Sequence, residues 1–203
     1  MRKKATWALA SLSAILMALL SGCASAGLPE TGFLRDYSKL KKVEEGRLRY
    51  ISPKLKDYSR FMIDPVELRA KKDDLKPEQR AEVARYMHEA IEKVLHKAAI
   101  QVVSQPDVGV ARVRVALTEI NDTKWYLNLH PATKVTGAGM GGAAMESEIV
   151  DSVTGEQLAA VVQARHASQF RLNAFSTISD VKNVIDQWAE AASERLKEIR
   201  AAK

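Results

Sequence analysis

Apolar residues recur at two different spacings along the chain, and the spacing separates helices from strands. Two stretches repeat apolar residues every three or four positions, which predicts helices over 77–98 and 179–201. Pro77 suits the first position of the earlier helix, and Thr177 and Asp180 have the spacing of a capping box for the later one. The predicted buried stripes are Val83, Met87, Ala90, Ile91, Val94 and Ala98 on the first helix and Val181, Val184, Ile185, Trp188, Ala192, Leu196 and Ile199 on the second.

The remaining ordered segments have the pattern of strands. They are residues 60–68, 100–104, 110–120, 143–153 and 156–171. Pro65 confines the first of these strands to an edge or bends it. Gly155 can supply the positive φ of a tight turn, which makes the last two strands a hairpin. The order of elements predicts one α+β domain, a mostly antiparallel sheet with two long helices packed on one face.

The first 22 residues have the pattern of a secretory signal, with three positive charges followed by an apolar run over 5–20. The run ends in Leu20-Ser21-Gly22-Cys23, which resembles the lipobox of bacterial lipoproteins. That resemblance implies cleavage between Gly22 and Cys23, with a diacylglycerol and an N-acyl chain such as palmitate on Cys23. The alternatives are an ordinary signal peptide or an uncleaved anchor, for which the run is short. In Gram-negative lipoproteins an Asp after the cysteine commonly signals retention in the inner membrane. Ala24 stands there in this chain, and the absence of Asp resembles the class directed to the outer membrane, which predicts an outer-membrane anchor facing the periplasm.

Residues 23–58 are polar and contain Gly, Pro and several Lys residues, which predicts a tether between the lipid and a domain over 59–203. Within this tether, four apolar side chains give part of it a means to dock on the domain. They are Phe33, Leu34, Tyr37 and Leu40.

The charge balance excludes one class of partner. The formal net charge is +6, but three of the 31 basic residues belong to the signal segment, so the mature chain carries about +3. A nucleic-acid partner is not expected, because such binding needs basic residues clustered on one face. Cys23 is the single cysteine, so the lipid uses it and neither a disulfide nor a thiol nucleophile is expected.

Three sets of residues suggest chemistry, and each has a plainer interpretation. Gly137, Gly139 and Gly142 fit G-x-G-x-x-G, but a strand follows them where a dinucleotide site needs a helix. His88, Glu92 and His96 share one face of the first helix, which indicates a solvated face rather than a metal site. The other histidines, His130 and His166, have no sequence pattern that pairs them with a nucleophile. We therefore expect no catalytic residue, no metal, and no cofactor other than the covalent lipid on the cysteine.

Two sets of residues are candidates for contact with a partner. Trp125 and Tyr126 lie in an irregular segment, where amphipathic aromatic residues are typical of binding sites. Arg112 and Arg114 alternate with apolar residues on one strand. Together with Thr118 on that strand and Arg165 on a later one, they would form a polar sheet face. The plainer interpretations are a lid over the sheet edge for the aromatic pair and a solvated sheet face for the arginines.

Several stretches resemble a family of bacterial lipoproteins known only as domain of unknown function 3313. They are residues 32–34, 36–40, 63–66, 151–156 and 158–160. The resemblance implies an envelope location but no activity, so no functional residue is carried over from it. We expect a non-enzymatic domain that binds another envelope component, a protein more than a small molecule. The alternatives are a small-ligand carrier or envelope hydrolase with the 137–142 loop as a lid, and a structural tether to peptidoglycan.

Overall fold

The computed structural model describes residues 30–70, 75–121, 142–166 and 176–201. Eight strands form one sheet in the order β1-β2-β8-β7-β6-β3-β5, with β4 also paired to β6. The strands are β1 Lys41–Glu44, β2 Arg47–Ile51, β3 Arg60–Ile63, β4 Glu67–Leu68, β5 Gln101–Val102, β6 Val110–Asn121, β7 Gly142–Asp151 and β8 Gln157–His166. The helices are the 3₁₀ turn η1 Pro53–Asp57 and the long helices α1 Pro77–Lys97 and α3 Thr177–Ala201.

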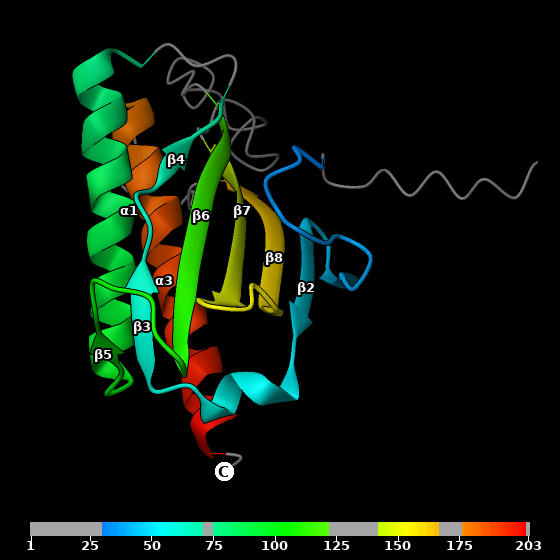
Figure 1. The fold of residues 1–203 in the computed structure, drawn as a ribbon. Helices are drawn as coiled ribbons and strands as arrows, with labels where there is room; N and C mark the ends of the chain where they lie inside the picture. The colour runs from blue at the N-terminus through cyan, green and yellow to red at the C-terminus, as the bar shows by residue number, and fades with distance from the viewer. Residues whose placement is uncertain (1–29, 71–74, 122–141, 167–175, 202–203) are drawn as a thin grey trace, which may run out of the picture.

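Both long helices lie side by side on one face of the sheet (Figure 1). The neighbouring strands β1, β2, β8, β7 and β6 pair antiparallel. At the other edge of the sheet, β3 and β4 pair parallel with β6, and β5 pairs parallel with β3. The predicted α+β class, with a mostly antiparallel sheet and two helices on one face, is confirmed. Neither helix contains an apolar stretch long enough to span a membrane, as far as the described residues go.

The core lies between the helices and the inner face of the sheet. Val113, Val115 and Leu117 of β6 point into it, as the alternation predicted. A bulge between Leu117 and Glu119 then shifts the register by one residue, which returns Ile120 to the same inner face. The predicted strand over 60–68 is divided into β3 and β4 around Pro65, because proline cannot donate to the ladder.

The expected tether over 23–58 is wrong for the part that the structure describes, residues 30–58. Strands β1 and β2 extend the sheet, and β2 pairs with β8 through Leu48↔Val162 and Tyr50↔Ala160. These apolar β2 residues alternate with Arg47 and Arg49, so the strand is amphipathic although its composition is basic. The folded domain therefore includes residue 30 and does not begin at residue 59.

The expected docking of the apolar residues before β1 is confirmed. Phe33 and Leu34 are 4% and 5% exposed and pack on the outer face of the sheet, opposite the helices. Tyr37 and Leu40 pack against the same cluster, which Ala116, Ala160 and Val162 complete from β6 and β8. The protein thus has three layers: the helices, the sheet and the segment 30–40.

Candidate ligand-binding site

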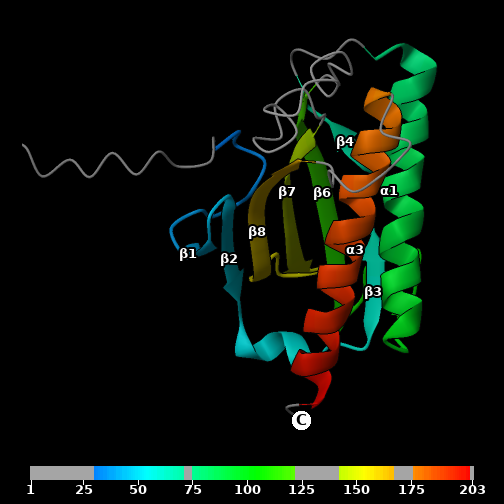
Figure 2. The same ribbon diagram turned by 180° about the vertical axis from the view of Figure 1, so that it is seen from behind.

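A cavity of about 210 Å³ lies between α3 and the inner face of the sheet. Figure 2 shows α3 crossing in front of β6 and β7, with β8 and β2 extending beyond it. The inner positions of the strands at this side, Ser147 and Ile149 on β7 and Val161 on β8, are half-buried because no helix covers them fully. Apolar side chains form the opposite wall, namely Met87, Ile91, Val94, Leu95, Ile185, Trp188, Leu196 and Ile199.

Small residues on both sides account for the space. Ser147 and Ala159 face inward from β7 and β8, and Ala189 and Ala192 line the cavity from α3. Protein interiors are ordinarily packed to the density of organic crystals. A run of small side chains between a helix and a sheet therefore leaves a volume that other side chains do not fill.

Three arginines border the cavity. Arg47 and Arg49 come from the inner face of β2, and Arg195 comes from α3. Arg47 pairs with Glu44 at 2.6 Å, and Arg195 pairs with Glu198 at 2.6 Å.

Arg49 differs from its two neighbours, because no ion pair or hydrogen bond of its side chain is found among the described residues. Burial lowers the pKa of Arg49, and the positive charges of Arg195 and Arg47 lower it further. Arginine remains protonated in proteins. The border of the cavity therefore carries an unpaired cation.

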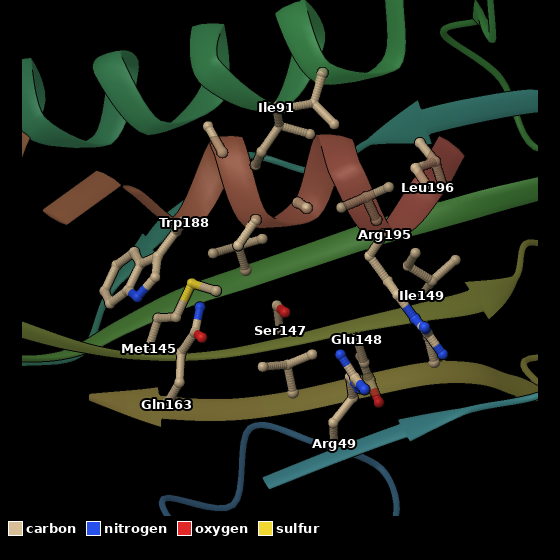
Figure 3. A pocket seen from close by; sticks show the side chains of 18 of the residues that line it. Arg49, Ile91, Met145, Ser147, Glu148, Ile149, Gln163, Trp188, Arg195 and Leu196 are labelled. Atoms are coloured by element: carbon tan, nitrogen blue, oxygen red, sulfur yellow. The ribbon is translucent and has the colours of Figure 1, made fainter. Parts of the chain in front are cut away.

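The residues around the cavity also hold hydrogen-bond donors without acceptors. Arg47 Nε, Arg195 Nε and Trp188 Nε1 are buried and have no hydrogen-bond partner in the described part of the chain. The Trp188 side chain is the most enclosed of the three residues, at 3% exposed. In Figure 3 its indole ring lies beside Met145 and Gln163, at the end of the view away from Arg49 and Arg195. Buried donors in native proteins are nearly always paired. These three N–H groups are therefore available to hydrogen-bond acceptor atoms of a ligand.

A second polar arrangement lies on the outer face of the sheet. Glu146 on β7 is fully buried and accepts a hydrogen bond from the amide of Thr31 at 2.8 Å and another from the Tyr37 hydroxyl. The Tyr37 oxygen in turn accepts the amides of residues 32, 33 and 34 at 3.0, 3.0 and 3.2 Å. Burial raises the pKa of Tyr37, and the Glu146 carboxylate raises it further. These contacts fasten the segment before β1 to the sheet.

Glu148, the next outer-face residue of β7, is 1% exposed and fastens the same segment. It accepts the amide of Arg35 at 3.0 Å and the side-chain amide of Gln157 at 3.1 Å, and it pairs with Arg114. The Arg114 guanidinium also lies over the Phe33 ring, 4.8 Å from its centroid.

Arg112 and Arg114 share one face of β6, as expected, but the expected place of Arg165 on that polar face, with Thr118, is wrong. Arg114 is used inside the fold, because its partner is a buried carboxylate. Arg112 stays nearer the surface and pairs with Asp64 at 3.1 Å, and its role toward a partner remains a prediction. Arg165 lies on the opposite, helix-bearing face, where it donates to Gln187 of α3 at 3.3 Å.

The β7–β8 turn is built around Asp151. Its Oδ1 accepts the amides of Val153 and Thr154 at 3.0 and 2.7 Å, and its Oδ2 accepts the Tyr58 hydroxyl at 2.8 Å. The Thr154 amide is the largest of the hydrogen bonds that lower the pKa of Asp151 from 3.8 to about 2. Burial and this carboxylate raise the pKa of Tyr58 to about 12. Gly155 has φ of +73°, as the turn prediction required.

The other sequence-predicted residues are placed as follows. His88 lies 3.7 Å from Glu92 on the exposed side of α1. The described residues contain no group of three side chains able to hold a metal ion. Gly142 begins β7. Several of the sequence-predicted residues lie outside the part of the chain that the structure describes, and so does the side chain of His166. These residues are Gly22, Cys23, Trp125, Tyr126, His130, Gly137 and Gly139.

The sequence predictions missed the cavity residues Arg47, Arg49 and Trp188 as functional candidates. Trp188 was predicted as a plain core residue. The two arginines fell within the expected tether. The alternation of Arg47, Leu48, Arg49 and Tyr50 is the signal that would have identified a strand with cationic inner positions.

The described chain is an α+β domain with a mostly apolar cavity, open on one side and bordered by arginines. Its sequence matches the family described as Protein of unknown function (DUF3313) over residues 29–192, so the chain belongs to that family. The sequence matches no curated protein.

Several solved structures are similar to the chain at low identity. The PelC dodecamer from Paraburkholderia phytofirmans is 9% identical, with 69% of this chain and 96% of that one covered and a TM-score of 0.42. A minor lipoprotein from Acinetobacter baumannii is 12% identical, with 70% and 95% covered and a TM-score of 0.37. A lipoprotein from Neisseria meningitidis is 9% identical, with 68% and 96% covered and a TM-score of 0.38.

Proposed function

We propose that this protein is a lipid-anchored, non-catalytic binding domain of the bacterial cell envelope, and that its ligand site is the cavity between α3 and the sheet. The observation that carries the proposal is the combination of about 210 Å³ of mostly apolar space with an unpaired cation at Arg49. Ligand sites are concave and mostly apolar, with a few polar groups that fix orientation. The buried carboxylates Glu146, Glu148 and Asp151 support the non-catalytic part, because their hydrogen bonds hold segments of the fold together.

The docked segment before β1 supports a position close to the membrane. If Cys23 carries the lipid, Thr31, the first residue held by Glu146, lies eight positions after the anchor. A fully extended chain covers about 3.5 Å per residue, so this spacer reaches at most about 28 Å. Thr31, and with it the outer layer of an anchored domain, would then stay within about one bilayer thickness of the lipid surface. Ala24 after the cysteine supports the outer membrane as that surface.

The proposal is tested by purifying the full lipidated chain from bacterial membranes and measuring non-covalently bound small molecules by native mass spectrometry. A Ser147→Phe variant places a large side chain on the cavity floor, and Val153→Phe places the same side chain on a turn that is 61% exposed. We expect a bound species in the wild type and in Val153→Phe that is lost in Ser147→Phe. Equal amounts in all three proteins, or none in a folded wild type, would contradict the proposal.

A protein partner is the second candidate, and one surface feature favours it. Val108 and Val153 are 77% and 61% exposed on two turns at the same end of the sheet. These turns are joined because the Asp107 amide donates to the Ser152 hydroxyl at 3.2 Å, and this hydroxyl donates to the Asp107 carbonyl at 3.0 Å. Two exposed apolar side chains on joined turns favour a protein contact.

This second candidate is tested by in-cell photocrosslinking from position 153, with position 88 on the exposed side of α1 as the control position. A discrete protein adduct from position 153 that disappears in Val108→Asp would support it. Identical adducts from both positions would mean that the contact is not specific.

A further inference from the structure

The volume of the cavity sets the size of the apolar group that it can take. An apolar cavity of about 150 Å³ in another protein takes up benzene, which has six carbons. By proportion, about 210 Å³ accommodates roughly eight carbons in a packed arrangement. The Ile91 and Leu196 side chains on one side and Val161 on the other supply walls without ionisable groups. A saturated hydrocarbon chain of medium length fits this description.

The arginines at the border of the cavity determine which polar head group the ligand can carry. Arg49 lines the cavity and forms no ion pair among the described residues. The carboxylates that act on it from a greater distance, Glu44 and Glu198, pair with its neighbours Arg47 and Arg195. Figure 3 shows the Arg49 and Arg195 guanidinium groups near one another at one end of the view. Two guanidinium groups near each other repel unless an anion lies between them, so this end of the cavity attracts a carboxylate or a phosphate.

The unpaired donors at the cavity favour the same kind of ligand group. Three cavity-lining side chains hold a buried polar atom without a partner among the described residues, and all three atoms are N–H donors: Arg47 Nε, Trp188 Nε1 and Arg195 Nε. A donor buried without an acceptor carries a free-energy cost, because it has lost its hydrogen bonds to water. A ligand rich in oxygen acceptors relieves that cost, whereas an amine or another cation does not.

We propose that the ligand of this cavity is an anionic amphiphile, with a single hydrocarbon chain between α3 and the strands β7 and β8 and a carboxylate or phosphate head on Arg49. The inference rests on the proposed function, since it names the chemical class of the ligand in the same site. A fatty acid and a phosphate monoester with one chain share this chemistry.

The test uses the full lipidated chain in nanodiscs of phosphatidylcholine, which carry no net charge. The probe is decanoate with a diazirine near the end of its chain, and the matched neutral probe is the corresponding alcohol. After irradiation, labelled peptides are mapped by mass spectrometry. We expect the acid to label residues 87–95, 157–163 and 185–199 in a saturable manner, and the alcohol to label them at least tenfold less.

Variants at the arginines make the test specific. Arg49→Gln should lower the labelling by the acid about tenfold, because a charge-assisted hydrogen bond contributes that much or more. Arg49→Lys should retain most of the labelling. The control is Arg85→Gln, since Arg85 is 72% exposed on α1 and its change should leave the labelling unaltered. Competition by unlabelled decanoate and by decyl phosphate then decides which head group binds more tightly.

The outcomes separate the inference from the proposed function. Equal labelling by the acid and the alcohol, unaffected by Arg49→Gln, would overturn the anionic amphiphile and leave an apolar ligand site. Labelling of the cavity by neither probe would overturn both. In the wild type, displacement of the labelled acid by decanoate or by decyl phosphate, together with no displacement by the same competitor in Arg49→Gln, supports the inference. The more effective competitor then identifies the head group.

Discussion

Replacing Tyr37 with phenylalanine removes one oxygen atom from the outer layer of the protein, and this atom takes part in four hydrogen bonds. It donates to the buried carboxylate of Glu146 and accepts the amides of residues 32, 33 and 34. The phenylalanine ring would still pack on the same apolar cluster. The Tyr37→Phe change therefore isolates the contribution of the hydroxyl group.

The expected cost follows from the burial of these groups. The bond to the Glu146 carboxylate contributes about 1.5 to 3 kcal/mol, because the acceptor is charged and fully buried. The part-buried amides of residues 33 and 34 lose an acceptor, at about 0.5 to 1 kcal/mol each, and the exposed amide of residue 32 turns to water. We expect Tyr37→Phe to lower the free energy of unfolding by about 3 kcal/mol in total.

The assay is urea unfolding of the chain, followed by fluorescence, with hydrogen exchange to localise the effect. The control is Tyr50→Phe, because Tyr50 packs on the same cluster and its hydroxyl makes no hydrogen bond within the described residues. This control should cost less than about 0.5 kcal/mol. The amides of residues 31–40 should exchange faster in Tyr37→Phe and not in Tyr50→Phe. Equal, small costs for both variants would refute the role assigned to the Tyr37 hydroxyl.

Three further predictions concern the sheet and its turn. Arg114→Gln should cost about 3 kcal/mol in urea unfolding, because it leaves the Glu148 carboxylate buried without its cation, whereas Arg112→Gln, at a surface ion pair, should cost less than about 1 kcal/mol; equal costs would contradict the assignment. The pKa of Asp151 is lowered from 3.8 to about 2, so its carboxylate stabilises the fold above pH 4 by roughly 1 to 2 kcal/mol, and this contribution is lost as the pH falls from 4 to 2. Unfolding free energies of the wild type and Asp151→Asn should converge over that interval, and a constant difference would contradict the pKa. Gly155→Ala should lower the melting temperature, because alanine at φ of +73° costs about 1 kcal/mol or more, and an unchanged melting temperature would show that the turn relaxes.

Regular amphipathic segments were predictable from the sequence because their signal is local. The helix expected over 77–98 is α1, and the hairpin turns at Gly155 as expected. In both cases the residues that define the element lie within a few positions of one another. Local spacing is what determines which side of a helix or strand is apolar.

The segment 30–58 was mistaken for a tether because its strand carries charge on the inner face. Arg47 and Arg49 face the cavity, where an ordinary core strand would carry apolar residues. A pattern search that takes polar residues as solvent-facing therefore reads β2 as a linker. The inner positions of Arg47 and Arg49 on β2 can be explained only once the cavity beside them is known.

The outer-face carboxylates could not be assigned from the sequence for a different reason. Glu146 and Glu148 alternate with inner residues on β7, which is the pattern of a solvated sheet face. Their partners Thr31 and Arg35 lie 115 and 113 residues earlier in the chain. No local pattern connects such distant positions, so the polar contacts of the third layer were beyond prediction, although the apolar residues of segment 30–40 indicated that it docks. The same holds for the cavity, which depends on small residues from separate elements facing each other.

The most direct test of the binding proposal is a crystal structure of the chain grown with 10-bromodecanoate, with the bromine located by anomalous scattering. The account predicts an anomalous peak between α3 and the strands β7 and β8, beside Ile91 and Leu196, with the carboxylate at Arg49. A cavity without such a peak, in crystals where Trp188 is well ordered and the compound is bound elsewhere or absent, would contradict it.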